Sequence, residues 1–441
     1  MEINKTDFCN TELYADILKN THFSLPQLHL PYCDDTTVLA KEKVVKGKIA
    51  HNRICYQPME GQDADENGNP TDLTFERYER LAKGGAGILW FEAVSVLPEG
   101  RSNAHQLMIN EKNLDSYKKL VDSVKENSVR NNGYEPIFIL QLNHSGRYSK
   151  PCGVPAPIVA MRNKFFDKPE LSYTFASDEY LKRLPEVFAE NAYLCEKAGL
   201  DGVDIKCCHG YLYSELLSAY ERAGIYGTSF ENRTRLLRDT FCACKSVLSH
   251  NTILSCRLNI YDGYNTPYSF GTDMNDHTKY NLDEPKKLID TLISLGLDLL
   301  NVTMGSPYVN PDVSRPYKTG IDIPKTNALS ALFRLFEGAC EIHRTFPDLP
   351  IVNTGVSGLC AKSHLAAAGM INDDMTDFVG FGRMNFAYPD LARDILAGEF
   401  DPKKACIACS GCSTLKKNGL LSGCIIRNKL YRDIYKEFTS K

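Results

Sequence analysis

Short runs of apolar and β-branched residues alternate along this chain with longer stretches in which apolar positions recur every three or four residues. The short runs are typical of buried strands, and the longer spacing is typical of amphipathic helices. The pattern predicts eight strands, at 52–59, 87–96, 136–143, 202–208, 252–260, 297–305, 349–358 and 377–387. It predicts helices after them, at 75–83, 114–125, 184–198, 232–248, 284–295, 328–343, 361–368 and 390–397.

Eight strand–helix pairs in strict alternation favour an α/β fold of the closed (β/α)8 type, a TIM barrel, over an open sheet. No Gly-x-Gly-x-x-Gly fingerprint follows any strand, because Asn385 takes the third glycine position after Gly380 and Gly382. The predicted organisation is a polar, aperiodic N-terminal extension at 1–45, the barrel at 46–400 and a cysteine-rich segment at 401–441.

Polar residues gather where the predicted strands end. Barrel enzymes carry their chemistry at the C-terminal ends of the strands, so these positions are candidates for an active site. Helix periodicity places none of them on a buried helix face. They are Glu60, Asn143, His144, Lys206, His209, Tyr211, Arg257, Asn259, Asn353, Thr354, Gly382 and Arg383.

Composition narrows the class of protein. The 441 residues are 43% hydrophobic and 24% charged with a net charge of −4, so no basic field argues for nucleic acid or an anionic membrane. No apolar run approaches the roughly 20 residues of a membrane span, and the first residues lack a secretion signal. Sixteen cysteines scattered through a chain of this length favour a reducing cytoplasm over a disulfide framework.

Four cysteines follow the last predicted strand–helix pair with the spacing Cys406-x2-Cys409-x2-Cys412-x11-Cys424. Three thiols in one tight loop and a fourth brought back by a short excursion are able to enclose a 4Fe-4S cluster. The alternative is a structural zinc ion with four thiolate ligands, although zinc sites more often use two separated C-x2-C pairs. We expect the iron–sulfur cluster.

Several motifs, taken in this order, resemble the old yellow enzyme family of FMN ene reductases. They are NRICYQPM at 52–59, QLNHSGR at 141–147, HGYL at 209–212, SFENRTR at 229–235, CRLN at 256–259, VNTG at 352–355 and GFGRMNFAYPDL at 380–391. With the cysteines, the resemblance extends to the iron–sulfur branch that contains 2,4-dienoyl-CoA reductase and trimethylamine dehydrogenase. That branch usually has one residue more between its second and third cysteines. This chain ends 17 residues after Cys424, without the FAD- and nicotinamide-binding module of larger relatives.

The resemblance implies an FMN site at the top of the barrel. Gln141 would hold the pyrimidine edge of the flavin, because an amide supplies both a donor and an acceptor. Arg257 would lie near flavin N1 and O2 and stabilise the anionic reduced ring. The phosphate would be held by Gly355, Gly382 and Arg383.

Strand-one residues would lie against the flavin ring itself. Pro58 and Met59 would pack on the isoalloxazine. Glu60 stands where many relatives have a small polar residue, and a carboxylate there disfavours extra electron density on the ring unless it is protonated or paired with Lys206.

The resemblance also implies a proton donor, Tyr211. The family pattern H-x-x-(H/N)-G-Y here runs Lys206-Cys207-Cys208-His209-Gly210-Tyr211, so a lysine replaces the first histidine. Hydride would pass from flavin N5 to the β-carbon of an α,β-unsaturated carbonyl, acid or thioester, and Tyr211 would protonate the α-carbon. His209 and Lys206 would polarise the carbonyl, although an ammonium lacks the directional geometry of an imidazole.

The expected function is therefore an FMN- and 4Fe-4S-dependent ene reductase acting on a small unsaturated molecule. Electrons would arrive through the cluster from a separate donor protein, or NAD(P)H would reduce the FMN directly. Two alternatives stay open: an amine dehydrogenase or demethylase of the trimethylamine dehydrogenase type, and an electron-transfer subunit without a substrate. The sequence allows a homo-oligomer without predicting one.

Overall fold

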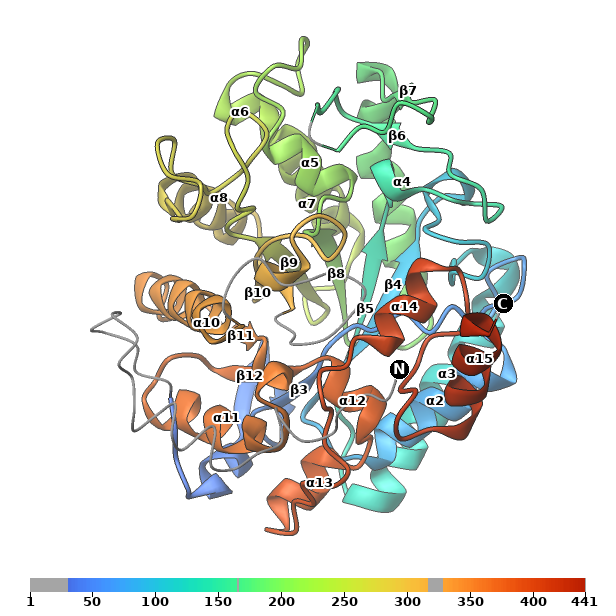
Figure 1. Ribbon diagram of the computed structural model, residues 1–441, viewed down its shortest axis with the longest axis vertical. Helices are drawn as coiled ribbons and strands as arrows, with labels where there is room; N and C mark the ends of the chain where they lie inside the picture. Colours follow the sequence, from blue (N-terminus) through green and yellow to red (C-terminus); the bar gives the residue numbers. More distant parts are fainter. Residues whose placement is uncertain (1–30, 165, 316–327, 441) are drawn as a thin grey trace.

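The computed structural model describes residues 31–164, 166–315 and 328–440, and its centre is a closed barrel of eight parallel strands (Figure 1). In order around the barrel they are β10 (Leu299–Thr303), β11 (Ile351–Thr354), β12 (Phe378–Phe381), β3 (Ile54–Tyr56), β4 (Ile88–Ser95), β5 (Ile137–Asn143), β8 (Gly202–Cys207) and β9 (Ile253–Asn259). β9 pairs with β10 and closes the ring. The predicted (β/α)8 barrel is confirmed. The first thirty residues of the predicted extension lie outside the described residues.

Helices carry the chain from the end of one strand back to the start of the next. The larger ones are α2 (Asp72–Lys83), α3 (Leu114–Asn132), α4 (Asp178–Lys197), α7 (Arg235–Val247), α8 (Asp283–Ser294), α10 (Ala328–Thr345) and α11 (Ser363–Asn372). Shorter helices are α5 (Leu212–Leu217), α6 (Phe230–Arg233), α9 (Pro311–Ser314), α12 (Arg383–Ala387) and α13 (Leu391–Leu396). After the barrel come α14 (Gly411–Lys417) and α15 (Lys429–Thr439).

Short 3-10 turns and two small sheets complete the described chain. The turns are η1 (Thr36–Ala40), η2 (Pro98–Gly100), η3 (Glu111–Asn113), η4 (Gly146–Tyr148) and η5 (Val356–Lys362). The small sheets pair β1 (Lys43–Val45) with β2 (Lys48–Ala50), and β6 (Ile158–Val159) with β7 (Thr174–Phe175). None of the helices in these described stretches combines the length and apolarity of a membrane span.

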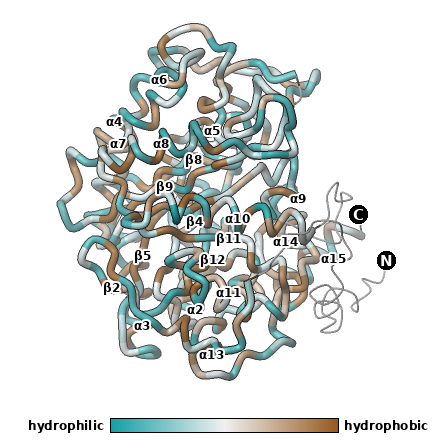
Figure 2. The backbone as a smooth tube through the Cα atoms, turned by 90° about the vertical axis from the view of Figure 1, so that its left-hand side faces the viewer, coloured by the Kyte–Doolittle hydropathy of each residue, from teal (hydrophilic) through white to brown (hydrophobic). Residues whose placement is uncertain are grey.

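The β1–β2 hairpin closes the barrel at the end where the strands begin, opposite their C-terminal ends. Val45 and Ala50 are fully buried there, in one cluster with inward-facing strand residues such as Trp90. Sequence patterning assigned the chain up to residue 45 to an aperiodic extension, because strands of three residues are too short to show alternation. Figure 2 shows the hydrophobic segments concentrated along the central strands, with α9 and α14 on the same side of the molecule.

The last strand is shorter than predicted. β12 ends at Phe381, and the backbone leaves the extended region at Gly382 (φ −93°, ψ −91°) before α12 begins. The predicted strand at 377–387 therefore contains a strand, a turn and a short helix. This break places Gly382 and Arg383 at the barrel mouth.

Candidate active site

A cavity lies at the C-terminal ends of the strands, and its empty space, including solvent at its open mouth, is about 1150 Å³. All eleven barrel residues that the sequence assigned to cofactor or catalysis line it: Pro58, Met59, Glu60, Gln141, Lys206, His209, Tyr211, Arg257, Gly355, Gly382 and Arg383. Their shared position is what the strand-end argument predicts, while their individual roles stay predictions.

The orientation of Gln141 fits a flavin edge. Its amide nitrogen donates to Asp204 Oδ2 at 2.6 Å, and Trp90 Nε1 donates to the same oxygen at 3.1 Å. Burial raises the pKa of Asp204 to about 6, although these two donors and the nearby Arg257 oppose that shift. Because the amide nitrogen is held on the aspartate, the amide oxygen is the group that Gln141 would offer to a ring N–H donor in the cavity.

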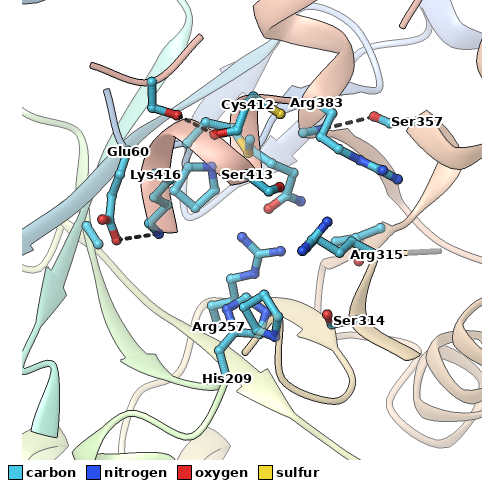
Figure 3. Close-up of a pocket in the computed structure, with 18 of the residues that line it drawn as sticks. Glu60, His209, Arg257, Ser314, Arg315, Ser357, Arg383, Cys412, Ser413 and Lys416 are labelled. Carbon is cyan, nitrogen blue, oxygen red and sulfur yellow. Dashed lines mark hydrogen bonds and ion pairs between the residues drawn. The ribbon is translucent and has the colours of Figure 1, made fainter. Parts of the chain in front are cut away.

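Arg257 supplies positive charge from β9. Its Nε is buried without a hydrogen-bond partner among the described residues, and the side chain reaches into the cavity (Figure 3). A buried guanidinium nitrogen that lacks a partner is costly, so the position suits an acceptor supplied by a bound group. Flavin N1 and O2 provide such acceptors, and the arginine therefore fits the role predicted for it.

The opposite wall suits a phosphate. Gly355 (φ 103°) turns the chain after β11, and Ser357, Gly382 and Arg383 line the cavity beside it. The Ser357 hydroxyl accepts hydrogen bonds from the backbone nitrogens of Gly382 and Met384 at 3.2 and 3.3 Å. The Ser357 O–H and the Arg383 guanidinium are donors of the kind that bind a phosphate group.

The turn after β8 presents the predicted catalytic groups. His209 (φ 63°) and Gly210 (φ 72°) both adopt left-handed conformations, which is uncommon for two successive residues and reverses the chain after the strand. Tyr211 N then donates to Cys208 O at 3.3 Å and α5 follows. The turn brings Lys206, at the end of the strand, close to Tyr211: its Nζ lies 3.8 Å from the centre of the tyrosine ring.

Two lysines share one buried carboxylate. Glu60 Oε1 lies 3.8 Å from Lys206 Nζ and 3.1 Å from Lys416 Nζ, and Ser102 Oγ donates to the other carboxylate oxygen at 3.1 Å. Burial raises the pKa of Glu60, but the two ammonium groups outweigh it and the net shift is downward. Glu60 is therefore a carboxylate at neutral pH. The pairing with Lys206 proposed from the sequence exists, and Lys416 is an additional partner.

Tyr211 belongs to a group of three tyrosines. Its hydroxyl lies 2.8 Å from the hydroxyl of Tyr308, which follows β10. The Tyr308 ring stacks on Tyr148, with centroids 4.0 Å apart, and Tyr148 meets Tyr211 edge to face at 5.7 Å. Burial, followed by the neighbouring Tyr308 and Glu60, raises the pKa of Tyr211 well above its usual value. The phenol is therefore protonated at neutral pH, as a proton donor must be.

His209 is a neutral imidazole. Burial and the surrounding cations, Arg257 first and Lys206 next, hold its pKa well below the usual range. Its Nε2 lies 3.4 Å from Thr303 Oγ1. A neutral ring offers one N–H donor and no charge, so it would orient a substrate oxygen while the positive charge comes from Lys206.

The four cysteines of the C-terminal segment surround a second, smaller cavity. Cys406, Cys409, Cys412 and Cys424 line it together with apolar side chains such as Ile425. Within the described residues, no three His, Cys, Asp or Glu side chains converge closely enough to hold a metal ion. Thiolates around one zinc ion, each at about 2.3 Å from it, lie close together. The four cysteines that either group would need thus line one cavity.

The backbone of the cysteine segment contains two left-handed residues, and two of its N–H groups donate to cysteine sulfur atoms. Ala408 (φ 55°) and Ser410 (φ 61°) adopt left-handed conformations within one short loop, a strain that is typical of functional sites. Ala408 N donates to Cys406 Sγ and Arg427 N donates to Cys424 Sγ, both at 3.4 Å. Hydrogen bonds to cysteine sulfur tune the potential of iron–sulfur clusters, so the donor set and its surroundings fit that group.

Sequence reasoning missed several residues that line the active-site cavity, among them Gln57, Tyr308, Arg315 and Lys416. Tyr308 follows a predicted strand end and was accessible to the same argument as the others. Lys416 was not, because it comes from the cysteine segment. Conversely, four polar strand-end residues hold loops or neighbouring backbone rather than lining the cavity: Asn143, His144, Asn259 and Asn353.

Known proteins resemble this chain in sequence and in structure. The chain is 30% identical over 253 residues to an NADPH dehydrogenase of Clostridium acetobutylicum, covering 56% of this chain and 70% of that protein. The structure resembles 2-naphthoyl-CoA reductase (TM-score 0.75, 20% identity), covering 90% of this chain and 58% of that one. It also resembles an old yellow enzyme homologue of Zymomonas mobilis (TM-score 0.61, 20% identity), covering 82% and 92% of the two chains.

The sequence pattern of one family extends over the whole barrel. It is the NADH:flavin oxidoreductase / NADH oxidase family, and it matches residues 44–400. The match begins at the β1–β2 hairpin and ends after α13, so it includes every barrel residue of the cavity. The chain therefore belongs to the NADH:flavin oxidoreductase / NADH oxidase family and is an oxidoreductase.

Proposed function

We propose that the protein is an FMN-dependent ene reductase whose electrons arrive through a 4Fe-4S cluster. The observation that carries the proposal is that the two cavities share a wall: Cys412 and Arg383 line both of them. A cluster held by the four thiols would thus lie directly beside the flavin cavity, which also contains a buried proton donor. The electron source would be a separate donor protein, with NAD(P)H as the alternative.

Each of the cavity residues would have a different role in the reduction of a C=C bond. Bound FMN supplies hydride chemistry. Lys206 and the N–H of His209 would bind the carbonyl oxygen of the acceptor and stabilise the negative charge that develops on it. Tyr211 would donate its phenolic proton to the α-carbon.

The structure favours this reaction over amine oxidation. Proteins that bind organic cations place aromatic faces around them. Here the ammonium of Lys206 already covers the Tyr211 ring at 3.8 Å, so an amine cation would meet a like charge at that position. An electron-transfer subunit without a substrate would have no use for the Tyr211 hydroxyl in the cavity.

Anaerobic purification with flavin, iron and sulfide analysis tests the proposal. We expect one FMN and about four irons per chain. Reduced protein should be reoxidised by at least one of cyclohex-2-enone, cinnamate and crotonyl-CoA, which represent a carbonyl, an acid and a thioester. Turnover should be fast with dithionite-reduced methyl viologen and slow with NADH or NADPH. A protein that carries zinc, or that reduces none of these acceptors, would contradict the proposal.

Activity should fall as the pH rises through about 8. Burial lowers the pKa of Lys206 to about 8, although Glu60 opposes the shift. The ammonium is the form that stabilises charge on the substrate oxygen, so kcat/KM should be highest below that pH and decline above it. The measurement is kcat/KM for the best acceptor between pH 6 and pH 10.

Two variants test whether Lys206 is the group responsible for this loss of activity at alkaline pH. Lys206→Arg keeps its charge over the whole range and should remove the decline, at a lower absolute rate. Glu60→Gln removes the carboxylate that raises the pKa of Lys206 and should move the decline to lower pH. A decline that stays at the same pH in Lys206→Arg would belong to another group.

A further inference from the structure

The cysteine segment contributes a side chain to the active site as well as its thiols. α14 starts beside Cys412, and one helical turn later Lys416 extends into the flavin cavity (Figure 3). The Lys416 side chain is 29% exposed, whereas Glu60, its partner at 3.1 Å, is 3% exposed. Lys416 thus joins a buried carboxylate to the solvent-accessible edge of the cavity.

Tyr308 joins Lys416 to the proposed proton donor. Lys416 and Tyr308 both line the cavity, and Glu60 first and Tyr308 next raise the pKa of the lysine, although desolvation opposes the shift. The Tyr308 hydroxyl lies 2.8 Å from the Tyr211 hydroxyl. Stacking on Tyr148 fixes the plane of the Tyr308 ring. Lys416, Tyr308 and Tyr211 thus all line the cavity, and the last two are in hydrogen-bond contact.

Tyr211 needs such a connection if it donates a proton in every turnover. The residue is only 1% exposed, so bulk water does not reach its hydroxyl directly. A tyrosinate left there after the reaction would be a strong base, because burial, Tyr308 and Glu60 raise the pKa of the phenol, and it would need a proton donor within hydrogen-bond reach. The enzyme would then stop after one turnover unless a proton returned along hydrogen bonds.

We propose that Tyr308 and Lys416 form a relay that returns a proton to Tyr211 after each reduction, an inference that rests on the proposed function. After the Tyr211 O–H proton passes to the α-carbon, the Tyr308 O–H proton moves to the Tyr211 oxygen. An N–H proton of Lys416 moves to the Tyr308 oxygen, and the neutral amine takes a proton from water. One solvent proton is consumed per C=C bond reduced, and no electron moves along this chain.

The relay would bring protons in beside the proposed entry of electrons. Cys412, which lines both cavities, and Lys416 lie on the same short helix. The cysteine segment would therefore serve both halves of a reaction that consumes electrons and protons together. Glu60 would hold Lys416 in place and is a positioning residue in this step.

The test compares the first turnover with later ones. In Tyr308→Phe the ring and its stacking remain, and Glu60 keeps both lysines. Lys416→Met breaks the chain at its outer end. Lys436→Met, an exposed lysine on α15, is the matched control. The protein is reduced anaerobically, mixed with one equivalent of the best acceptor by stopped flow, and then assayed at steady state with reduced methyl viologen.

Tyr211 is already protonated in the resting protein, so the first turnover of both relay variants should stay within about twofold of wild type. Their steady-state rate should fall about tenfold or more, because reprotonation becomes limiting, and the solvent deuterium isotope effect on kcat should rise. Lys436→Met should behave as wild type. Equal loss in both phases, or no loss in either, would overturn the relay.

A second readout does not depend on activity. In protein labelled with 13C at tyrosine Cζ, Lys416→Met should shift the Tyr308 resonance and, through it, that of Tyr211, whereas Lys436→Met should shift neither. Assignment comes from Tyr308→Phe and Tyr211→Phe. Unchanged resonances would remove the relay alone. A wild-type protein that reduces no unsaturated acceptor would remove the proposed function, and the catalytic role of the relay with it.

Discussion

Replacing Tyr211 by phenylalanine should slow reoxidation of the reduced protein by an unsaturated acceptor about 10²- to 10⁴-fold, the usual contribution of a general acid. The ring that lies under Lys206 and against Tyr148 is retained, so the loss is confined to the hydroxyl. Flavin content, and the rate at which reduced methyl viologen reduces the flavin, should not change. Stopped-flow measurement of the two half-reactions separates these effects.

Tyr213→Phe is the matched control for this experiment. Tyr213 is equally buried, lies two residues further along, and its hydroxyl is 2.8 Å from Thr240 Oγ1 behind α5. Losing that hydroxyl should cost some stability, about 1 kcal/mol, and leave the half-reactions unchanged. If Tyr211→Phe reoxidises at the wild-type rate, another group or water donates the proton.

The fold was predictable from the sequence because burial imposes different periods on strands and helices. Parallel barrel strands are covered on both faces and appear as continuous apolar runs, as at Ile88–Ser95, where every residue is buried. The predicted boundaries of strands were less accurate where a strand ends but the residues after it remain hydrophobic. The segment after Phe381 is the example: its residues remain mostly buried although the strand has ended.

The composition of the cavity was predictable to the extent that it depends on strand ends. Closing the barrel necessarily brings the ends of β3, β5, β8, β9, β11 and β12 together, so residues as far apart as Glu60 and Arg383 were expected to share a site. Contributions from segments outside the alternating pattern were not predictable. The packing of α14 against the barrel mouth depends on the tertiary fold of the cysteine segment, and it brings in Lys416.

A β-bulge supplies a further feature that patterning does not reveal. The register of β4 shifts between Phe91 and Ala93, which turns Glu92 out of the strand toward Arg77 and Gly61. Ala93 then lines the cavity, and Glu92 Oε2 accepts a hydrogen bond from Gly61 N at 3.0 Å, next to Glu60. Bulges of this kind commonly redirect side chains beside active sites.

Substitution of the cysteines in the C-terminal segment is the second change for which we expect a large effect. Cys406→Ser or Cys412→Ser should reduce the iron content from about four per chain to less than one, because a hydroxyl is a poor ligand for iron in this type of cluster. FMN should remain bound, since its predicted contacts come from the barrel. Turnover driven by the protein donor should fall by about 100-fold or more. The loss is this large because the variants remove the whole path of electrons to the flavin and not a single contact.

The chemistry downstream of the flavin should survive in these variants. Flavin that is reduced chemically with dithionite should still be reoxidised by the acceptor, within about tenfold of the wild-type rate, because Tyr211 and Lys206 come from the barrel. Cys242→Ser, at an exposed position on α7, is the control and should retain iron and donor-driven turnover. Iron assay, electron paramagnetic resonance of the reduced protein and both half-reactions decide the outcome. If Cys412→Ser keeps full donor-driven turnover, electrons reach the flavin without the cysteine segment, and NAD(P)H becomes the expected reductant.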